Sequence, residues 1–83
     1  MEVISIVRSP IKFKKYRANV IYKGKQYNNV DFGDTRYQQF KDQTPLKLYS
    51  NLDHNDPIRR KSYLARHKHN DGPAGYLSRN FLW

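Results

Sequence analysis

The chain contains no cysteine, and only seven of its 83 residues are acidic. Without cysteine there is no disulfide to hold a small fold together and no thiolate ligand for a metal ion. No apolar run is long enough to span a bilayer or to form the core of a signal peptide. We therefore expect a soluble protein that is made in a reducing compartment.

A chain of this length predicts one small domain, residues 1–83, with a β-sheet part at 2–32 and a helical part at 56–83. Such a domain buries only about 60% of its unfolded surface, so its core is thin. Aromatic residues make up 14% of the chain, with seven tyrosines, four phenylalanines and one tryptophan. Because each ring removes a large apolar area from water, we expect rings to dominate the core.

The net charge of +9 is unevenly distributed along the chain. Residues 1–30 carry seven Lys or Arg against one acid, and residues 57–83 carry six against one. Between them, residues 31–56 carry three Lys or Arg against five acidic residues. Two basic ends and an acidic middle permit internal neutralisation, attraction to an anionic partner, or simply a solvated face.

The N-terminal part predicts a small antiparallel sheet. Residues 3–7 form a short segment of mostly β-branched residues, which favours a strand. In the next segment an alternating pattern places four residues on one strand face, namely Tyr16, Ala18, Val20 and Tyr22. Lys23-Gly24 predicts a tight turn, and residues 25–32 return as the partner strand, with Val30 and Phe32 on one face.

The middle of the chain predicts little regular structure. Thr35 is a candidate cap for a short helical turn over residues 36–41, in which Tyr37 and Phe40 share a face. Residues 42–55 have turn-forming residues at both ends, so they are interpreted as either a loop or an insertion.

Residues 56–69 predict one basic helix. Asp56 suits its cap, Pro57 its first position, and residues 70–73 its end. Ile58, Ser62 and Ala65 form a narrow apolar side. The aromatic tail from Ala74 to Trp83 predicts a short second helix. The predicted class is therefore α+β, a small N-terminal antiparallel sheet packed by the basic helix and the aromatic-rich helix.

Basic side chains and rings are the candidate binding groups. The candidates for binding nucleic acid or an acidic partner are Lys12, Lys14, Lys15, Arg17, Arg59, Arg60, Lys61, Arg66 and Lys68. The candidate partner-contact aromatics are Tyr76, Phe81 and Trp83. Trp83 is interpreted as either a core plug or a hook for a partner, with the plug favoured.

The three histidines are a weaker indication of a metal site or a nuclease. They lie in Asp53-His54-Asn55 and in His67-x-His69-Asn70-Asp71. His67 and His69 are two residues apart, so on a helix they point in nearly opposite directions. Positive charge at a helix end explains them better, and we expect no catalytic residue, no metal and no cofactor.

Four ordered motifs carry a resemblance across about residues 16–83. They are Val30-Asp31-Phe32-Gly33, then Tyr37-x-x-Phe40, then His54-x-Asp56-Pro57-x-Arg59-Arg60-x-x-Tyr63-x-x-Arg66-His67, then Ala74-Gly75-Tyr76-x-Ser78-x-x-x-Leu82-Trp83. The string resembles a family of small, uncharacterised basic proteins of large double-stranded DNA viruses and phages. That family provides no enzymatic activity to transfer to this chain.

The resemblance implies a viral setting. The first expectation is a non-enzymatic virion protein, a minor capsid or cementing subunit made in the host cytoplasm or nucleus. Its basic faces, 12–17 and 59–68, would dock on other virion proteins or on packaged DNA, with no membrane and no small-molecule substrate. The alternatives are a free nucleic-acid-binding protein and, third, a small nuclease or its accessory subunit.

Overall fold

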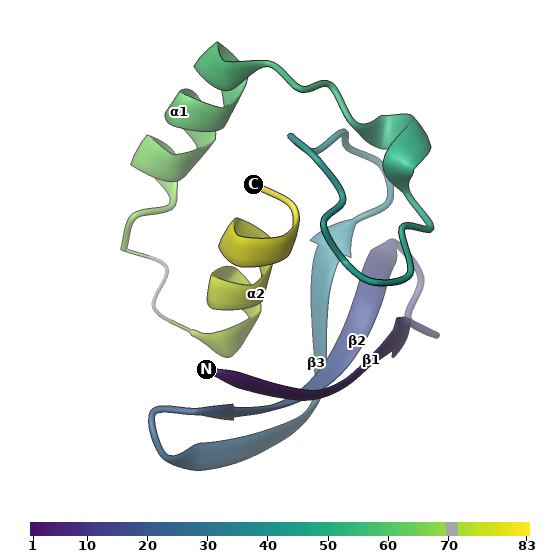
Figure 1. The fold of residues 1–83 in the computed structure, drawn as a ribbon, viewed down its shortest axis with the longest axis vertical. Helices are drawn as coiled ribbons and strands as arrows, with labels where there is room; N and C mark the ends of the chain where they lie inside the picture. Colours follow the sequence, from purple (N-terminus) through teal and green to yellow (C-terminus); the bar gives the residue numbers. More distant parts are fainter. Residues whose placement is uncertain (70–71) are drawn as a thin grey trace.

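Three antiparallel strands in the order β1-β2-β3 form the sheet of the computed structural model, which describes residues 1–69 and 72–83. The strands are β1 (Glu2–Arg8), β2 (Lys14–Tyr22) and β3 (Lys25–Asp34). After a long connection with a 3-10 turn, η1 (Ser50–Leu52), come the helices α1 (Pro57–Arg66) and α2 (Pro73–Phe81). Figure 1 shows the sheet and helices, and the predicted α+β class is confirmed.

The β2–β3 hairpin closes at the predicted Lys23-Gly24 turn. The φ angles of 52° at Lys23 and 76° at Gly24 are both positive, as a two-residue type I′ turn requires. One extra residue in β3 then shifts the register between Ala18 and Val20. Asn29 has a φ of 57° there, and its N–H donates to Asn19 Oδ1 at 2.9 Å. This bulge increases the local twist of the hairpin.

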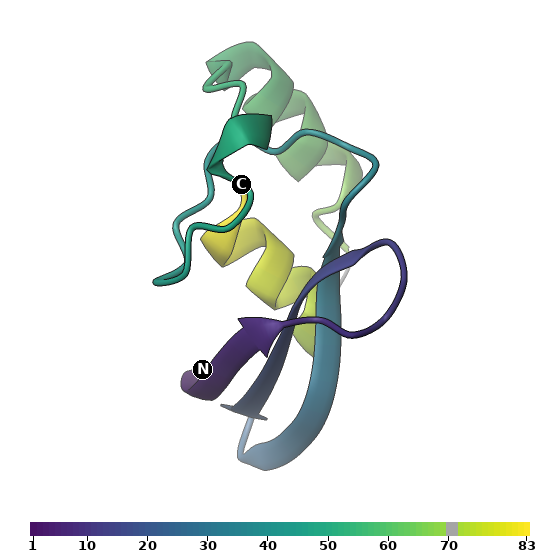
Figure 2. The ribbon, with the colours of Figure 1, turned by 90° about the vertical axis from the view of Figure 1, so that its right-hand side faces the viewer.

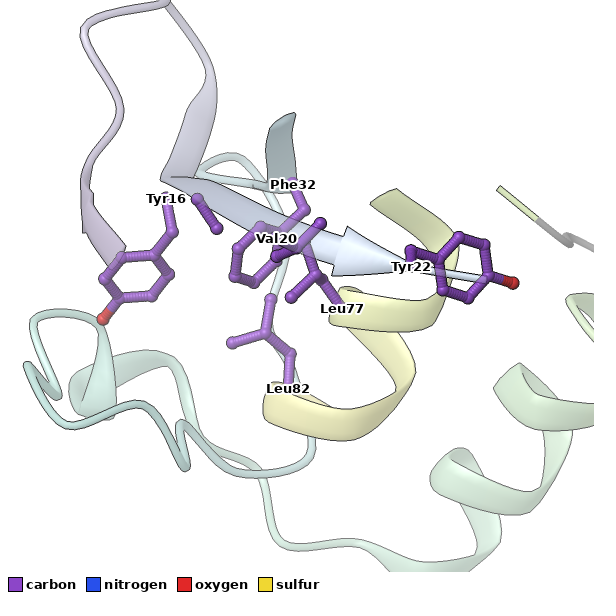
Figure 3. Packing of buried hydrophobic residues seen from close by; sticks show 7 residues of the cluster. Tyr16, Val20, Tyr22, Phe32, Leu77 and Leu82 are labelled. Carbon is purple, nitrogen blue, oxygen red and sulfur yellow. The ribbon is translucent and has the colours of Figure 1, made fainter. Parts of the chain in front are cut away.

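The core lies between one face of the sheet and α2. All four residues of the predicted β2 face are buried, and they meet Phe32 of β3 and two leucines, Leu77 of α2 and Leu82 just after it. Figure 3 shows Val20, Phe32, Leu77 and Leu82 gathered between strand and helix, with the Tyr16 and Tyr22 rings toward the two ends of the cluster. Rings do dominate: Tyr16 packs against Phe32 with centroids 5.8 Å apart, and Tyr22 against Tyr76 at 5.4 Å.

Helix α1 does not cover the sheet, contrary to the expectation from sequence. Its N-terminus is as predicted, because Asp56 accepts from the N–H groups of Ile58 and Arg59 and Pro57 opens the helix. However, α1 has no buried residue, and Ile58 on its predicted apolar side is 76% exposed. Figures 1 and 2 show α2 lying between α1 and the sheet. The apolar stripe of α1 is too narrow to compete with α2 for the sheet.

The C-terminal end of the predicted basic helix differs from expectation. The helix ends at Arg66, and residues 67–69 form a turn instead of a further helical turn. The predicted stop at Asn70 and Asp71 lies outside the described residues.

The connection from 35 to 55 is mostly irregular and its helical residues are those of η1, so the predicted helical turn at 36–41 is wrong. Gln39 forms a parallel bridge with Asp53, and its N–H donates to Leu52 O at 3.2 Å. Further along, Lys41 and Gln43 donate N–H groups to the carbonyls of Leu82 and Phe81. These long-range partners satisfy the backbone and replace the local bonds of a helix.

Gly33 tests how tightly β3 packs, because a Cβ there would lie 2.8 Å from Leu82 Cδ1 and 3.0 Å from Lys15 Cδ. Gly24 is the matched control, since it has a similar positive φ but a Cβ there would meet no atom within 4 Å. We expect Gly24→Ala to lower the free energy of unfolding by about 1–2 kcal/mol through backbone strain. Gly33→Ala should lower the free energy of unfolding by about 1–3 kcal/mol more than Gly24→Ala, because its new methyl group overpacks the site. Urea unfolding measures both, and equal losses would contradict the packing around Gly33.

Candidate functional site

A buried lysine anchors the 35–55 connection to β2. The Lys15 side chain is 2% exposed, and its Nζ donates to Tyr37 O at 3.0 Å and to Gln39 Oε1. The amide nitrogen of Gln39 donates in turn to Tyr49 O at 2.7 Å and to Asp53 Oδ1 at 2.6 Å. Burial lowers the pKa of Lys15 to about 8, although three nearby aspartates act in the opposite direction.

A second buried group, the Asp42 carboxylate, organises the same connection. It accepts hydrogen bonds from the Tyr16 hydroxyl, from Tyr49 N–H at 3.1 Å, and from both the N–H and the hydroxyl of Thr44. Figure 3 shows the Tyr16 oxygen directed at this part of the chain. Although burial opposes it, this bonding holds the pKa of Asp42 below its usual value. A carboxylate with four donors can be buried in its charged form.

The acidic middle of the chain is therefore used largely as internal scaffold. Five of the six acidic residues in the described part of the chain accept hydrogen bonds from it, namely Asp31, Asp34, Asp42, Asp53 and Asp56. Across residues 1–69 and 72–83, the ion pairs are Arg17 with Asp31 at 3.0 Å and Arg36 with Asp34 at 2.8 Å. The basic residues of α1 take part in neither, so internal neutralisation leaves their charge in place.

Stacked rings hold α1 at a distance from the sheet. Trp83 stacks on Tyr63 of α1 with centroids 4.1 Å apart and planes 5° apart, and His67 also stacks on Tyr63 with centroids 4.2 Å apart. The Tyr63 hydroxyl also lies 3.1 Å from the Ser78 hydroxyl of α2. His54 contacts Trp83 at 5.2 Å. Trp83 is therefore half-buried and joins α1 to the body of the protein.

A cleft of ≈ 560 Å³ separates α1 from α2 and the end of the sheet. Its floor includes the buried Lys15 and Phe32, and exposed basic side chains of β2 and α1 line it, namely Lys14, Arg59 and Arg66. Tyr37, Tyr63 and Trp83 add aromatic surface. Asp31 and Asp34 also line the cleft, but each is paired with an arginine. The cleft thus combines cations that form no ion pair among the described residues with aromatic rings.

The structure separates the predicted basic set into four groups. Lys14, Arg59 and Arg66 meet at the cleft, while Lys12, Lys61 and Lys68 are exposed but are not among its lining residues. Arg17 pairs with Asp31. Two residues are used internally: Arg60 donates to Trp83 O and lies over the Phe40 ring, and Lys15 is buried. The expectation that Lys15 faces a partner is therefore wrong.

The predicted aromatic set mostly packs inward. Tyr76 lies against Tyr22, and Phe81 lies against Phe32 with centroids 6.4 Å apart, so both belong to the margin of the core. Of the three predicted rings, only Trp83 reaches the cleft. Sequence reasoning missed Tyr37 as a cleft residue because it placed that ring beside Phe40 on one face of a short helical turn.

His54 and His67 belong to the group of stacked rings, whereas His69 is exposed. His54 Nδ1 accepts from the Asp56 N–H at 2.9 Å, and its Nε2 is buried without a hydrogen-bond partner among the described residues. Within 1–69 and 72–83, no group of three or more His, Asp or Glu side chains could hold a metal ion. The His69-Asn70-Asp71 candidate falls partly outside the described residues. Neither α1 nor α2 has the length and apolar character to cross a bilayer.

Comparison of the chain with protein-family models, with curated proteins and with solved structures gave no match.

The burial of Lys15 predicts an unusual dependence of stability on pH. Between pH 8 and 10.5 the unfolded chain binds the Lys15 proton and the folded chain does not, so stability should rise with pH in that window. Burial and the Asp42 bond raise the pKa of Tyr16 to about 12, so the Tyr16 contribution should make stability fall from pH 10 to 12. In denaturant unfolding, Lys15→Met should show no rise in the free energy of unfolding over this pH window. Lys14→Met, at the exposed neighbouring position, should keep the rise. A rise that persists in Lys15→Met would contradict the assignment.

The stack of Tyr63 on Trp83 predicts how α1 is held. Tyr63→Leu should lower the free energy of unfolding by about 0.5–1.5 kcal/mol beyond the change in buried area. It should also change the fluorescence of Trp83, the only tryptophan, and increase amide hydrogen exchange within α1. Tyr37→Leu is the control, because the Tyr37 side chain is exposed and leaves the stack intact. Unchanged exchange in α1 would show that other contacts hold the helix.

Proposed function

We propose that the protein is a non-catalytic binding protein whose cleft takes the phosphate backbone of a nucleic acid. The observation that carries the proposal is the charge arrangement at the cleft. The aspartates are engaged within the fold, while Lys14, Arg59 and Arg66 lie together without ion pairs in the described chain. Cations grouped beside rings suit phosphates and bases, which together make up a nucleic acid.

The geometry favours nucleic acid over an acidic protein surface. An acidic protein face needs only a field of positive charge, and the exposed Lys61 and Lys68 would serve as well as the cleft cations. The cleft offers more than charge, because arginine forks can hold phosphate oxygens in pairs and the exposed Tyr37 ring beside them offers a flat apolar face. The Gln38 Oε1 accepts from Arg59 Nη1 at 2.8 Å, which orients this guanidinium at the cleft.

The resemblance to proteins of large DNA viruses supplies the proposed setting. There the nucleic acid would be packaged DNA, and the protein would be a virion-associated structural subunit. A free nucleic-acid-binding protein is the alternative setting for the same cleft. Mass spectrometry of purified particles from the source virus separates the two, because a subunit is retained in the particle and a free factor remains in the lysate.

Two matched double variants test the cleft. Arg59→Gln with Arg66→Gln and Lys61→Gln with Lys68→Gln each remove two charges from the same region, but only the first pair lines the cleft. In fluorescence anisotropy with a labelled oligonucleotide, the first should bind more than about ten-fold more weakly and lose roughly two units of salt slope. The second should have a smaller effect.

Three outcomes would count against this proposal. Equal losses in the two double variants would mean that overall charge acts and the cleft does not. An absence of binding at low salt would remove the function altogether. Binding of polyglutamate in preference to the oligonucleotide would assign the basic surface to an acidic protein partner.

A further inference from the structure

Beside the cleft, Phe13 holds an exposed ring on an unfavourable backbone. Its φ is 68°, in the left-handed region that bulky residues avoid, and its side chain is 42% exposed. The tight link between β1 and β2 requires this conformation, since Lys14 N–H donates to Ile11 O and Thr35 N–H donates to Phe13 O. Glycine or asparagine would meet that requirement at lower cost. Core packing does not account for a phenylalanine at this position.

A fixed guanidinium connects Phe13 to a second exposed ring. Arg36 lies 4.4 Å from the centroid of Phe13 and 5.8 Å from that of Tyr37, which is 65% exposed. Two bonds to Asp34, at 3.0 and 2.8 Å, hold the guanidinium plane in place. The Asp34 carboxylate also accepts the Arg36 N–H at 2.9 Å. A cation held this firmly keeps its position between two rings without a ligand.

This group is adjacent to the cationic cleft. Tyr37 and Asp34 belong to both, and Gln38, the next residue, binds Arg59 at 2.8 Å. On the other side, Lys12 Nζ lies 5.0 Å from the Phe13 centroid and precedes the cleft residue Lys14 by two positions. Cations therefore flank the rings on both sides.

We infer that Phe13, Arg36 and Tyr37 form a stacking platform that makes the protein select single-stranded nucleic acid. The inference rests on the proposed function and adds which form of nucleic acid is bound. Of the two proposed settings it favours the free nucleic-acid-binding protein, because the DNA packaged by a double-stranded DNA virus is a duplex. The bases of a duplex stack on one another and hide their faces, whereas unpaired bases can stack on protein rings. A strand leaving the cleft would place a base on Tyr37 and the next on Phe13, and Lys12 would move from that ring to a phosphate. Stacking of this kind is tolerant of sequence.

The side chain of Tyr37 can be removed without disturbing the fold. Its structural contacts are made by the backbone, because its carbonyl accepts from Lys15 Nζ and its N–H donates to Asp34 O at 3.2 Å. Tyr37→Ser is therefore the primary variant. Phe13→Asn is the second, since asparagine tolerates a positive φ. Ile4→Ser with Leu46→Ser serves as the control, because both residues are exposed and lie outside the cleft lining.

Anisotropy titrations with labelled oligothymidine and with a duplex of equal length measure the selection. The unmodified protein should bind the single strand about ten-fold more tightly than the duplex. Tyr37→Ser and Phe13→Asn should each weaken single-strand binding by about ten-fold, with an unchanged salt slope and unchanged duplex affinity. The control should match the unmodified protein, and thermal melting confirms that each variant is folded.

The platform and the cleft fail in different ways. Equal affinity for the two forms, or an unchanged single-strand affinity in folded Tyr37→Ser, would overturn the platform and leave the cleft as a general phosphate site. Binding of neither form at low salt would remove the proposed function as well. Tyr37→Ser decides the question even if Phe13→Asn does not fold.

Discussion

The placement of the Lys15 ammonium inside the protein is the constraint on which the rest of the structure depends. A buried charge must be compensated, and here Tyr37 O and Gln39 Oε1 accept hydrogen bonds from the ammonium while three nearby aspartates favour its charged form. Because Tyr37 and Gln39 follow β3 in the chain, the 35–55 connection must lie against the end of the sheet. The irregular 35–55 connection is thereby fixed to the sheet and forms part of this small fold.

The same constraint decides where the charge of the protein is available. Aspartates that could have neutralised α1 are bonded inside the connection or paired with Arg17 and Arg36. Arg59 and Arg66 of α1 and Lys14 of β2 are left around a cleft between the helices and the sheet. The excess positive charge is localised at the cleft because most of the aspartates are bonded elsewhere in the fold. The proposed binding of phosphate follows from this division.

The aromatic rings of the scaffold have two structural roles, filling the core and holding α1 in place. Tyr16, Tyr22 and Phe32 fill the space between sheet and α2, where large apolar surfaces compensate for the small number of core residues. Tyr63 and Trp83 instead stack with nearly parallel planes, half-buried, and fix α1 at the side of the cleft. Phe13 and Tyr37 belong to neither group, since they remain exposed beside a fixed arginine. That difference in burial separates scaffold rings from candidate binding rings.

Local patterns in the sequence determined the sheet, its Lys23-Gly24 turn, the inward face of β2, the cap of α1 and the presence of a second helix. Each depends on neighbours a few residues apart, and such neighbours are visible in one dimension. Tertiary structure alone decided that α2 packs on the sheet, that Lys15 is buried, and that Lys14 meets Arg59 and Arg66. These outcomes depend on partners more than twenty residues away, and on competition between two helices for one apolar face. Charge and periodicity identify the candidates for such contacts but do not determine which of them meet.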